Sequence, residues 1–476
     1  MNQLANYCNE LFLAEGISLY RFCKNHHLER TSIRRLLNGE RLPKEKIFEA
    51  FADALTLTPE ESVKLHELYQ CQKLGKRRYE NRIFIKEFLD DVGSNHNFQF
   101  QTNISSEYHR TLLSTSTAKI DHPLELSYIF QHLFVIEENC VYSNIPADHR
   151  LFRHSVQEGF YENKHIIPFY HILTLLKQSD ICHNVNYNLS VLKNVAPCAL
   201  QNHLNYQPFY FYGNQINKNT SAAFPYYLLT SNYLLLISAD CNQGLLSTDA
   251  TIIDSFHKQC QKTMKLSRPF IHHSASPTQL LEYYQSNLSR PSHPLFTFDF
   301  FPCLFKIYSR DLFLPQLTQE FANNEKLVQM VESLSLTNAG YPPYEAFLSY
   351  EGLIHFAKTG ELCQSCRHIL TPFPVKERKI ILNQVLTYCK EGSYHLHILP
   401  KNYFHNLPEI NLEVFNDHRV TILSMNKENL FSFFYLKENS IYDSFLDYFE
   451  SLLENPEVCS VAQSAEIITE IVQKYL

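Results

Sequence analysis

The first 72 residues repeat an amphipathic pattern that predicts five short helices. Apolar side chains recur at three- and four-residue spacing, which places them on one face of a helix, and turn residues separate the runs. A helix start is clearest at Thr58-Pro59-Glu60-Glu61, where the threonine can cap, the proline fits the first turn and Glu61 completes a capping box. Gly39 follows the third apolar run and suits the left-handed residue beyond a helix end. Residues 1–72 are therefore expected to form an all-α domain.

The third predicted helix, near position 33, has a polar face rich in arginine. Ile33, Leu36 and Leu37 fall within about 100° of arc and are expected to face the core. The opposite arc carries side chains suited to DNA, namely Arg30, Thr31, Ser32, Arg34, Arg35 and Asn38. Arginine can bind guanine through two hydrogen bonds or hold a phosphate, and hydroxyl and amide groups can do either. Only His27-Leu28-Glu29 separate this helix from the preceding one, and so tight a junction predicts a helix-turn-helix unit.

The same region resembles the Cro/C1-type (XRE) helix-turn-helix family over residues 16–61, which read GISLYRFCKNHHLERTSIRRLLNGERLPKEKIFEAFADALTLTPEE. The likeness is carried by the apolar residues of the scanning helix, by LERTSIRRLLNG with Ile33 at the family's buried position, and by the link from Gly39 to Pro43. The resemblance implies DNA binding, and it implies two roles for the polar face. Base-reading positions would be held by Arg30, Thr31, Ser32 and Arg34, and Arg35 and Asn38 would lie near phosphates.

Two residues depart from the family pattern. His27 stands where the family usually has a small residue in the turn, and Glu29 stands where Ser or Thr is common. A carboxylate at that position would repel phosphate. The arginine-bearing face could instead contact another protein, and that alternative stays open at this point.

Charge is unevenly distributed along the chain. The net charge is -7, but residues 1–82 contain 14 Lys or Arg and 11 Asp or Glu, whereas the remainder contains 28 and 38. A small basic module joined to a large acidic body hints at a polyanionic partner for the first. The basic stretch 73–82 fits either a segment along the DNA backbone or a solvated connector.

Glycine spacing excludes several kinds of nucleotide and acyl-transfer site. The chain has 11 glycines, and no two of them are closer than eight positions. A GxGxxG fingerprint, a Walker A loop and a GxSxG nucleophile elbow each need glycines that are closer together. The 13 cysteines, the absence of a readable secretory signal and the interrupted apolar run 226–239 together predict a cytoplasmic protein with reduced thiols.

The chain beyond residue 96 mixes strand and helix patterns. Strands are predicted on both sides of a Thr-Ser-Asn turn within 224–240, at 394–399 and at 420–424, and helices at 250–265, 277–288, 316–333, 344–359, 375–389, 440–453 and 460–475. The expected fold class is α+β, with an all-α five-helix domain followed by a large mixed α/β regulatory domain. The predicted parts are a helix-turn-helix domain (1–72), a basic linker or helix (73–95), one sensor lobe (96–300) and a second sensor or dimerisation lobe (301–476).

The large region also resembles the long C-terminal regions of uncharacterised XRE-family regulators from gut Firmicutes. The likeness is carried by YYLLTSNYLLLISAD with Thr248-Asp249, by the block from Glu351 to Gly360, and by FLDYFESL beginning at Phe445. It implies a regulatory domain and names no ligand.

Several polar and aromatic groups in this region are candidates for chemistry. Cys363 and Cys366 have metal-ligand spacing, but no second close pair accompanies them, so whether they bind a metal stays open. His395 and His397 alternate on one predicted strand face, and the aromatic run 206–212 could line a pocket or fill the core. Asp240 and Asp249 bracket a loop. Because none of these forms a catalytic signature, no cofactor, metal or catalytic residue is predicted.

The leading hypothesis is a sequence-specific transcriptional regulator that binds double-stranded DNA, most simply as a homodimer on an inverted repeat. Its C-terminal region would sense a small-molecule or peptide effector, and it would not be an enzyme. The alternative is an enzyme body, a hydrolase or transferase, that carries a DNA-binding tag. A third idea, a tetratricopeptide array, requires a repeat of about 34 residues that the sequence lacks.

Overall fold

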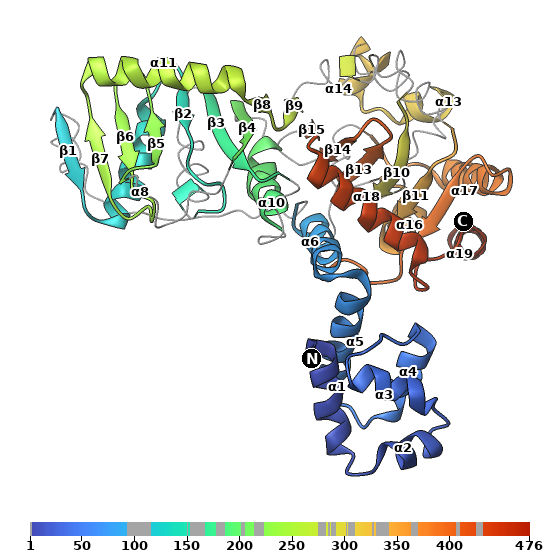
Figure 1. Cartoon of the computed structure of the whole chain (residues 1–476). Coiled ribbons are helices and arrows are strands. Elements are labelled where there is room, and N and C mark those ends of the chain that lie inside the picture. The colour runs from blue at the N-terminus through green and yellow to red at the C-terminus, as the bar shows by residue number, and fades with distance from the viewer. Residues whose placement is uncertain are drawn as a thin grey trace. The chain divides into compact units, whose positions relative to one another are not determined.

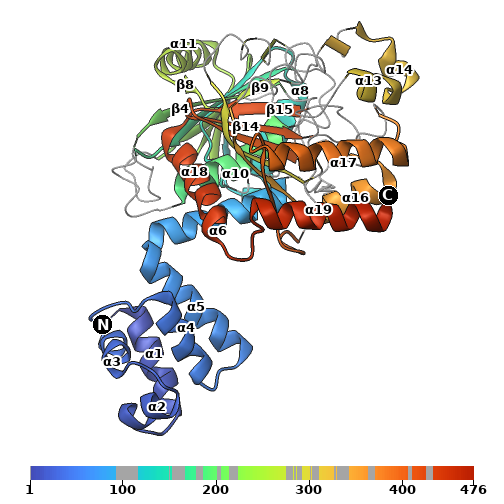
Figure 2. The ribbon, with the colours of Figure 1, turned by 90° about the vertical axis from the view of Figure 1, so that its right-hand side faces the viewer.

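The structure is a computed structural model of the whole chain (Figures 1 and 2). It describes residues 2–92, 116–149, 151–152, 167–177, 186–200, 205–213, 223–274, 282–283, 286, 292–300, 302, 310–325, 328–329, 342–362, 370–405, 410–424 and 432–476. The chain divides into an N-terminal unit, residues 1–84, and a C-terminal unit, residues 85–476. Helices alone form the first and a mixture of helices and sheets forms the second, so the predicted α+β class is confirmed.

The N-terminal unit contains the five expected helices. They are α1 (Gln3–Ala14), α2 (Leu19–Asn25), α3 (Arg30–Leu37), α4 (Glu45–Ala54) and α5 (Pro59–Leu74). Their apolar faces meet in one core, where the ring of Phe48 stacks on that of Tyr69 with 3.8 Å between centroids. The Tyr69 hydroxyl donates to the carbonyl of Pro43, so even this buried polar atom has a partner.

A further helix, α6 (Lys76–Val92), follows after Gly75, whose φ is +84°. Most of the basic stretch 73–82 is therefore helical. The second half of α6 belongs to the C-terminal unit, where Phe88 packs edge-on against Phe445 and Asp91 pairs with Lys193 at 2.8 Å.

The C-terminal unit contains an eight-stranded sheet in the order β1-β7-β6-β5-β2-β3-β4-β8. Its strands are β1 (Thr117–Ile120), β2 (Val141–Ser143), β3 (Pro168–Leu175), β4 (Asn205–Tyr212), β5 (Tyr226–Leu229), β6 (Leu234–Ile237), β7 (Gly244–Ser247) and β8 (Arg268–Pro269). The helices α8 (Pro123–Ile136), α10 (Tyr187–Ala199) and α11 (Ala250–Leu266) accompany them. Phe169 meets Phe134 of α8, and the next residue, Tyr170, joins the cluster under α11, so α8 and α11 cover opposite faces.

A second, seven-stranded sheet has the order β12-β11-β10-β13-β14-β15-β9. Its strands are β9 (His272–Ser274), β10 (Pro294–Asp299), β11 (Glu345–Leu348), β12 (His395–Ile398), β13 (Ile410–Phe415), β14 (Arg419–Ser424) and β15 (Ser432–Leu436). The helical elements are α13 (Arg310–Phe313), a 3₁₀ turn η4 (Leu314–Gln316), α14 (Gln319–Ala322), α16 (Tyr350–Thr359), α17 (Val375–Lys390), α18 (Asn439–Glu454) and α19 (Val461–Tyr475). Helices α17 and α19 lie side by side, as Figure 2 shows.

Apart from the additional edge strand β8 of the first sheet, the two sheets have the same topology. The order β4-β3-β2-β5-β6-β7-β1 in the first corresponds strand for strand to β12-β11-β10-β13-β14-β15-β9 in the second. In each of these seven-strand orders, the first three strands pair parallel and the remaining pairs are antiparallel, and β8, which pairs antiparallel with β4 at the edge of the first sheet, has no counterpart in the second. A helix follows the last strand in both, α11 in one and α18 in the other. The body is therefore built from two lobes of one design.

One short segment links the lobes. β8 pairs with β4 of the first sheet, and β9, two residues later, pairs with β15 of the second. Side chains reinforce the link: the Asn188 amide donates to the Ser440 hydroxyl at 2.9 Å, and the Tyr212 hydroxyl donates to Glu438 at 2.7 Å. β9 and β10 fall within 96–300, the first lobe predicted from the sequence, whereas β11 to β15 fall within 301–476, the second. The second sheet therefore combines residues from both predicted lobes.

Several predicted elements are confirmed and one is wrong in part. The hairpin within 224–240, the strands at 394–399 and 420–424, and the helices beginning near 250, 375, 440 and 460 are present. The prediction of a helix over 344–359 is wrong at its start, because Glu345–Leu348 forms β11 and the helix begins at Tyr350. Within the described part of 316–333, Gln316 ends η4, Gln319–Ala322 form α14, and Glu325, Val328 and Gln329 are helical, while 326–327, 330–333 and most of 277–288 lie outside the described residues.

We predict that Thr58→Ala lowers the free energy of unfolding of the N-terminal unit by about 1 kcal/mol. The Thr58 hydroxyl accepts from the Glu61 amide, and the Glu61 carboxylate accepts from the Thr58 amide, so the substitution removes half of the capping box. Hydrogen exchange of residues 2–84 in the full chain measures the effect. Thr56→Ala, at an exposed threonine two residues earlier, is the control, and an equal effect of both changes would contradict the assignment.

Candidate nucleic-acid interface

The turn between α2 and α3 is closed by backbone hydrogen bonds around a left-handed residue. Ser18 caps α2, and His27, just past its end, has a φ of +54°. The Leu28 amide donates a hydrogen bond to the Cys23 carbonyl at 2.9 Å, which is the six-to-one bond of a Schellman motif. This conformation explains why small residues suit the position of His27, since a Cβ strains left-handed backbone.

Helix α3 ends in the same way, with the residue expected there. Gly39 has a φ of +72°, its amide donates to the Leu36 carbonyl at 2.9 Å, and the Glu40 amide donates to the Arg35 carbonyl at 2.9 Å. The predicted glycine end of this helix is confirmed. The Asn9 amide of α1 donates to the Leu37 carbonyl at 2.6 Å, which satisfies another terminal acceptor of α3.

The apolar face of α3 is buried as predicted. Ile33 has no exposed surface, and Leu36 and Leu37 are also buried, in the core formed with α1, α2 and α4. Burying three such side chains stabilises the domain by roughly 5–8 kcal/mol before entropy is counted. This face therefore fixes the rotation of α3 about its own axis.

The opposite face carries the six candidate DNA-contacting residues, and the structure keeps them accessible. Arg30, Thr31, Arg34, Arg35 and Asn38 are exposed and Ser32 is half-buried. Within the described part of the chain, none of the three arginines forms an ion pair with a carboxylate. Their charges are thus available to an external anion.

Two of the six residues are already engaged by neighbouring carboxylates. The Ser32 hydroxyl donates to Glu29 at 2.9 Å, and the Asn38 amide donates to Glu40 at 2.7 Å. A DNA contact by either would have to share or replace that bond. The arginines and Thr31 are therefore the most available side chains on this face.

Tyr20 is a further member of this surface that the sequence did not single out. It lies on α2, is 61% exposed, and its ring centroid is 5.9 Å from the Arg30 guanidinium carbon. Exposed aromatic rings beside arginine suit both stacking and cation–π contact. No sequence rule pairs residues ten positions apart on different helices, so only the turn geometry reveals the contact.

The surroundings of α3 are basic. Residues 18–46 contain eight Lys or Arg and three Asp or Glu, and Arg21, Lys24, Arg41 and Lys44 are exposed there. Such clustering attracts phosphate and raises association rates. Along the stretch 73–82, in contrast, Lys73 pairs with Glu45 at 2.9 Å and Lys76 lies 3.6 Å from Glu80, so these two lysines already have carboxylate partners.

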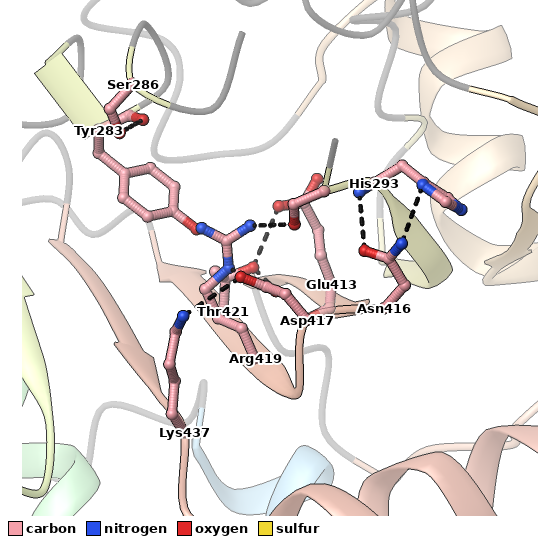
Figure 3. A network of polar contacts seen from close by, with 10 residues as sticks. Tyr283, Ser286, His293, Glu413, Asn416, Asp417, Arg419, Thr421 and Lys437 are labelled. Carbon is pink, nitrogen blue, oxygen red and sulfur yellow. Dashed lines mark hydrogen bonds and ion pairs between the residues drawn. The ribbon is translucent and has the colours of Figure 1, made fainter. Parts of the chain in front are cut away.

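The second lobe contains a buried polar network on β13 and β14 (Figure 3). Arg419 is 1% exposed, and its guanidinium donates to the Ser292 hydroxyl at 3.0 Å. The Arg419 Nε lies 3.5 Å from the Asp417 carboxylate, and the guanidinium carbon lies 4.0 Å from the centroid of the Phe415 ring. Across the strand pair, the Thr421 hydroxyl donates to the carboxylate of Glu413 at 3.0 Å. Burial raises the pKa of Glu413, and the hydrogen bond from Thr421 and the charge of Arg419 oppose that rise. The hydrogen bond from Arg419 to Ser292 links β14 to the residues just before β10.

The remaining candidates have local partners. Glu345 lies 2.9 Å from His395 and 2.7 Å from His397, and these hydrogen bonds, that from His397 above all, lower the pKa of Glu345. Asp240 accepts from the Ser238 hydroxyl, which lowers its pKa, and Asp249 caps α11.

The aromatic run 206–212 forms β4, and Tyr206 and Tyr210 are buried within it. Among the described residues no group of three His, Cys, Asp or Glu side chains could hold a metal ion. Cys363 and Cys366 lie outside them.

We predict that His27→Gly raises the free energy of unfolding of the N-terminal unit by about 0.5–1 kcal/mol, because glycine adopts a positive φ without a Cβ clash. Thermal unfolding of the full chain, followed by probes in residues 2–84, measures this. The control is His26→Gly, where φ is −104° and the ring packs on Phe22, and there stability should fall. Equal losses in both variants would contradict the strain argument.

We predict that Glu413→Gln stabilises the C-terminal unit above neutral pH. Because the pKa of Glu413 is raised in the folded state, the stability that this carboxyl contributes is fully present below its unfolded pKa of ~4.3. That stability is lost as the pH rises through the pKa of the folded state. The neutral amide avoids that loss, so the variant's gain in melting temperature should grow from pH 4 to pH 8. Glu466→Gln, at an exposed position on α19, is the control, and a gain that shrinks with rising pH would contradict the prediction.

Comparisons with known proteins leave the family unassigned. No family model and no curated protein matches the chain. Similar solved structures include TrmBL2, an archaeal chromatin protein described as having a novel mode of DNA binding, at 8% identity and a TM-score of 0.22, covering 45% of this chain and 72% of that one. Another is the phosphatidylserine synthase of Haemophilus influenzae, at 9% identity and a TM-score of 0.22, covering 77% of this chain and 96% of that one.

Similarity at this level carries no argument about activity. In the described residues, no helix has the length and apolar character that crossing a membrane requires. The functional conclusion therefore depends on the residues of the site themselves.

Proposed function

We propose that this protein is a sequence-specific, DNA-binding transcriptional regulator whose N-terminal unit is a helix-turn-helix domain of the XRE kind. The observation that carries the proposal is the division of α3 into two faces. Three aliphatic side chains are buried, and three arginines without carboxylate partners among the described residues are exposed on the other side. A helix of this kind, preceded by a tight turn and a capped α2, has the form of a recognition helix.

The residues divide between recognition and positioning. An eight-residue helix is about 12 Å long, which matches the width of the major groove. Arg30, Thr31 and Ser32 lie in the first turn of α3 and Arg34 in its last turn, and all four would face base edges, with Arg34 suited to a guanine. Arg35 and Asn38, nearer its end, would contact phosphates.

The C-terminal unit is assigned regulation and dimerisation in this proposal, and no catalytic role. Two lobes of one topology provide a large body, and the second half of α6 contacts elements of both: Lys193 on α10, and Phe445 on α18. An effector that shifted α10 against α18 would act on α6, and α6 continues without a break into the N-terminal unit. A homodimer would set two α3 helices one helical turn apart on an inverted repeat in the cytoplasm.

The proposal predicts that Arg34→Ala weakens binding to the selected operator by about 5- to 150-fold, since a good contact between arginine and guanine contributes about 1–3 kcal/mol. The measurement is fluorescence anisotropy of the full chain on duplexes recovered from a random library, repeated over a range of salt concentrations. Arg268→Ala, at an exposed arginine on β8, should leave the affinity unchanged. If the wild-type protein binds no duplex in a salt-sensitive manner, the proposed function is wrong.

A further inference from the structure

Glu29 is an unusual residue at the start of α3. It occupies the N-cap position, but its side chain makes no capping hydrogen bond to the helix backbone. Instead, its carboxylate accepts from the Ser32 hydroxyl at 2.9 Å. Glu29 is exposed, and it pairs with no lysine or arginine in the part of the chain that the structure describes, although three arginines share its helix.

A carboxylate in this position opposes binding to DNA in general. It lies at the end of α3 that enters a groove first in helix-turn-helix docking, so it would approach a polyanion without a neutralising partner. Serine or alanine at position 29 would avoid this cost. The unfavourable electrostatic free energy of placing this carboxylate near DNA is offset only where the DNA presents a hydrogen-bond donor to it.

The chemistry of the major groove restricts which base can do so. Guanine presents only acceptors there and thymine an acceptor and a methyl group, so both would face the carboxylate unfavourably. Adenine presents the N6 donor beside the N7 acceptor, which repels a carboxylate. Cytosine presents the N4 donor with no acceptor of its own, and it is the base that glutamate reads.

We infer that Glu29 is a specificity-determining residue that selects cytosine at one position of each half-site. This inference rests on the proposed function and deepens it, because it names a base that α3 reads. Ser32 is then a positioning residue, since its hydroxyl holds the carboxylate in one orientation before DNA is bound. The same carboxylate that weakens non-specific binding thereby favours one sequence over others.

The test compares the full-length wild-type protein with Glu29→Ala and Glu29→Gln in selection from a random duplex library followed by sequencing. The wild type should prefer cytosine at one position by about 5- to 150-fold over other bases. In Glu29→Ala this preference should fall to within about twofold, the remaining positions should be unchanged, and affinity for unrelated DNA should rise. Arg268→Ala is the control that should preserve the whole motif.

A chemical probe isolates the proposed contact. N4-methylcytosine at the selected position keeps the base pair but places a methyl group where the donor to Glu29 would be. It should lower the affinity of the wild type about as much as a base change does, and it should leave the affinity of Glu29→Ala unchanged.

If Glu29→Ala binds every duplex more tightly and keeps the same motif, Glu29 only repels DNA, and this inference is wrong while the proposed function stands. If the wild type selects no motif and shows no salt-sensitive binding, both are overturned.

Discussion

Burial of three aliphatic side chains on a single short helix determines what the N-terminal unit presents to its surroundings. Ile33, Leu36 and Leu37 leave α3 only one rotation about its axis, because any other would expose them. Helical periodicity then turns Arg30, Arg34 and Arg35 outward. The two turns that bound the helix, closed around His27 and Gly39, set its length and entry angle. The arginine surface is thus a consequence of the core.

The C-terminal unit depends on a different constraint. Its two sheets repeat one strand order and meet through the segment that forms β8 and β9. In the second lobe, charge is buried on β13 and β14, where Arg419 and Glu413 are held by hydroxyl, carboxylate and aromatic neighbours. Such buried charges cost stability when they lose a partner, so they favour one arrangement of the hairpin over others. The two lobes thus share one strand order, and the second half of α6 contacts both of them through Lys193 and Phe445.

The sequence predicted the N-terminal unit well because local signals and packing agree there. The capping box at Thr58, the glycine at position 39 and the aliphatic spacing of α3 all describe the same helices. In the body the signals conflict. Residues 345–348 form a parallel strand buried on both faces, and a short apolar run of that kind cannot be told from a helix by periodicity. The repeated topology could not be predicted from the sequence either. Two sheets can share a strand order when both have apolar residues in register, and their residues need not be identical.

The candidate site shows the same contrast. The outward direction of Arg30, Arg34 and Arg35 follows from helical geometry and could be predicted. The contact of Tyr20 with Arg30 and the engagement of Ser32 by Glu29 depend on the turn at His27 and on side-chain rotamers, so only the structure reveals them. The network of Glu413 and Arg419 had no sequence signal, since charged residues beside a hairpin turn ordinarily suggest exposure.

The central claim is that α3 enters the major groove through its arginine-bearing face. Methylation protection of guanine N7, an atom of the major groove, tests it most directly on duplexes that the full-length protein selects. The account predicts protected guanines in each half-site, and it predicts that the combined change of Arg30, Arg34 and Arg35 to alanine abolishes the protection while the fold is retained. Unprotected guanine N7 atoms in a bound duplex, or protection that survives the triple change, would contradict it.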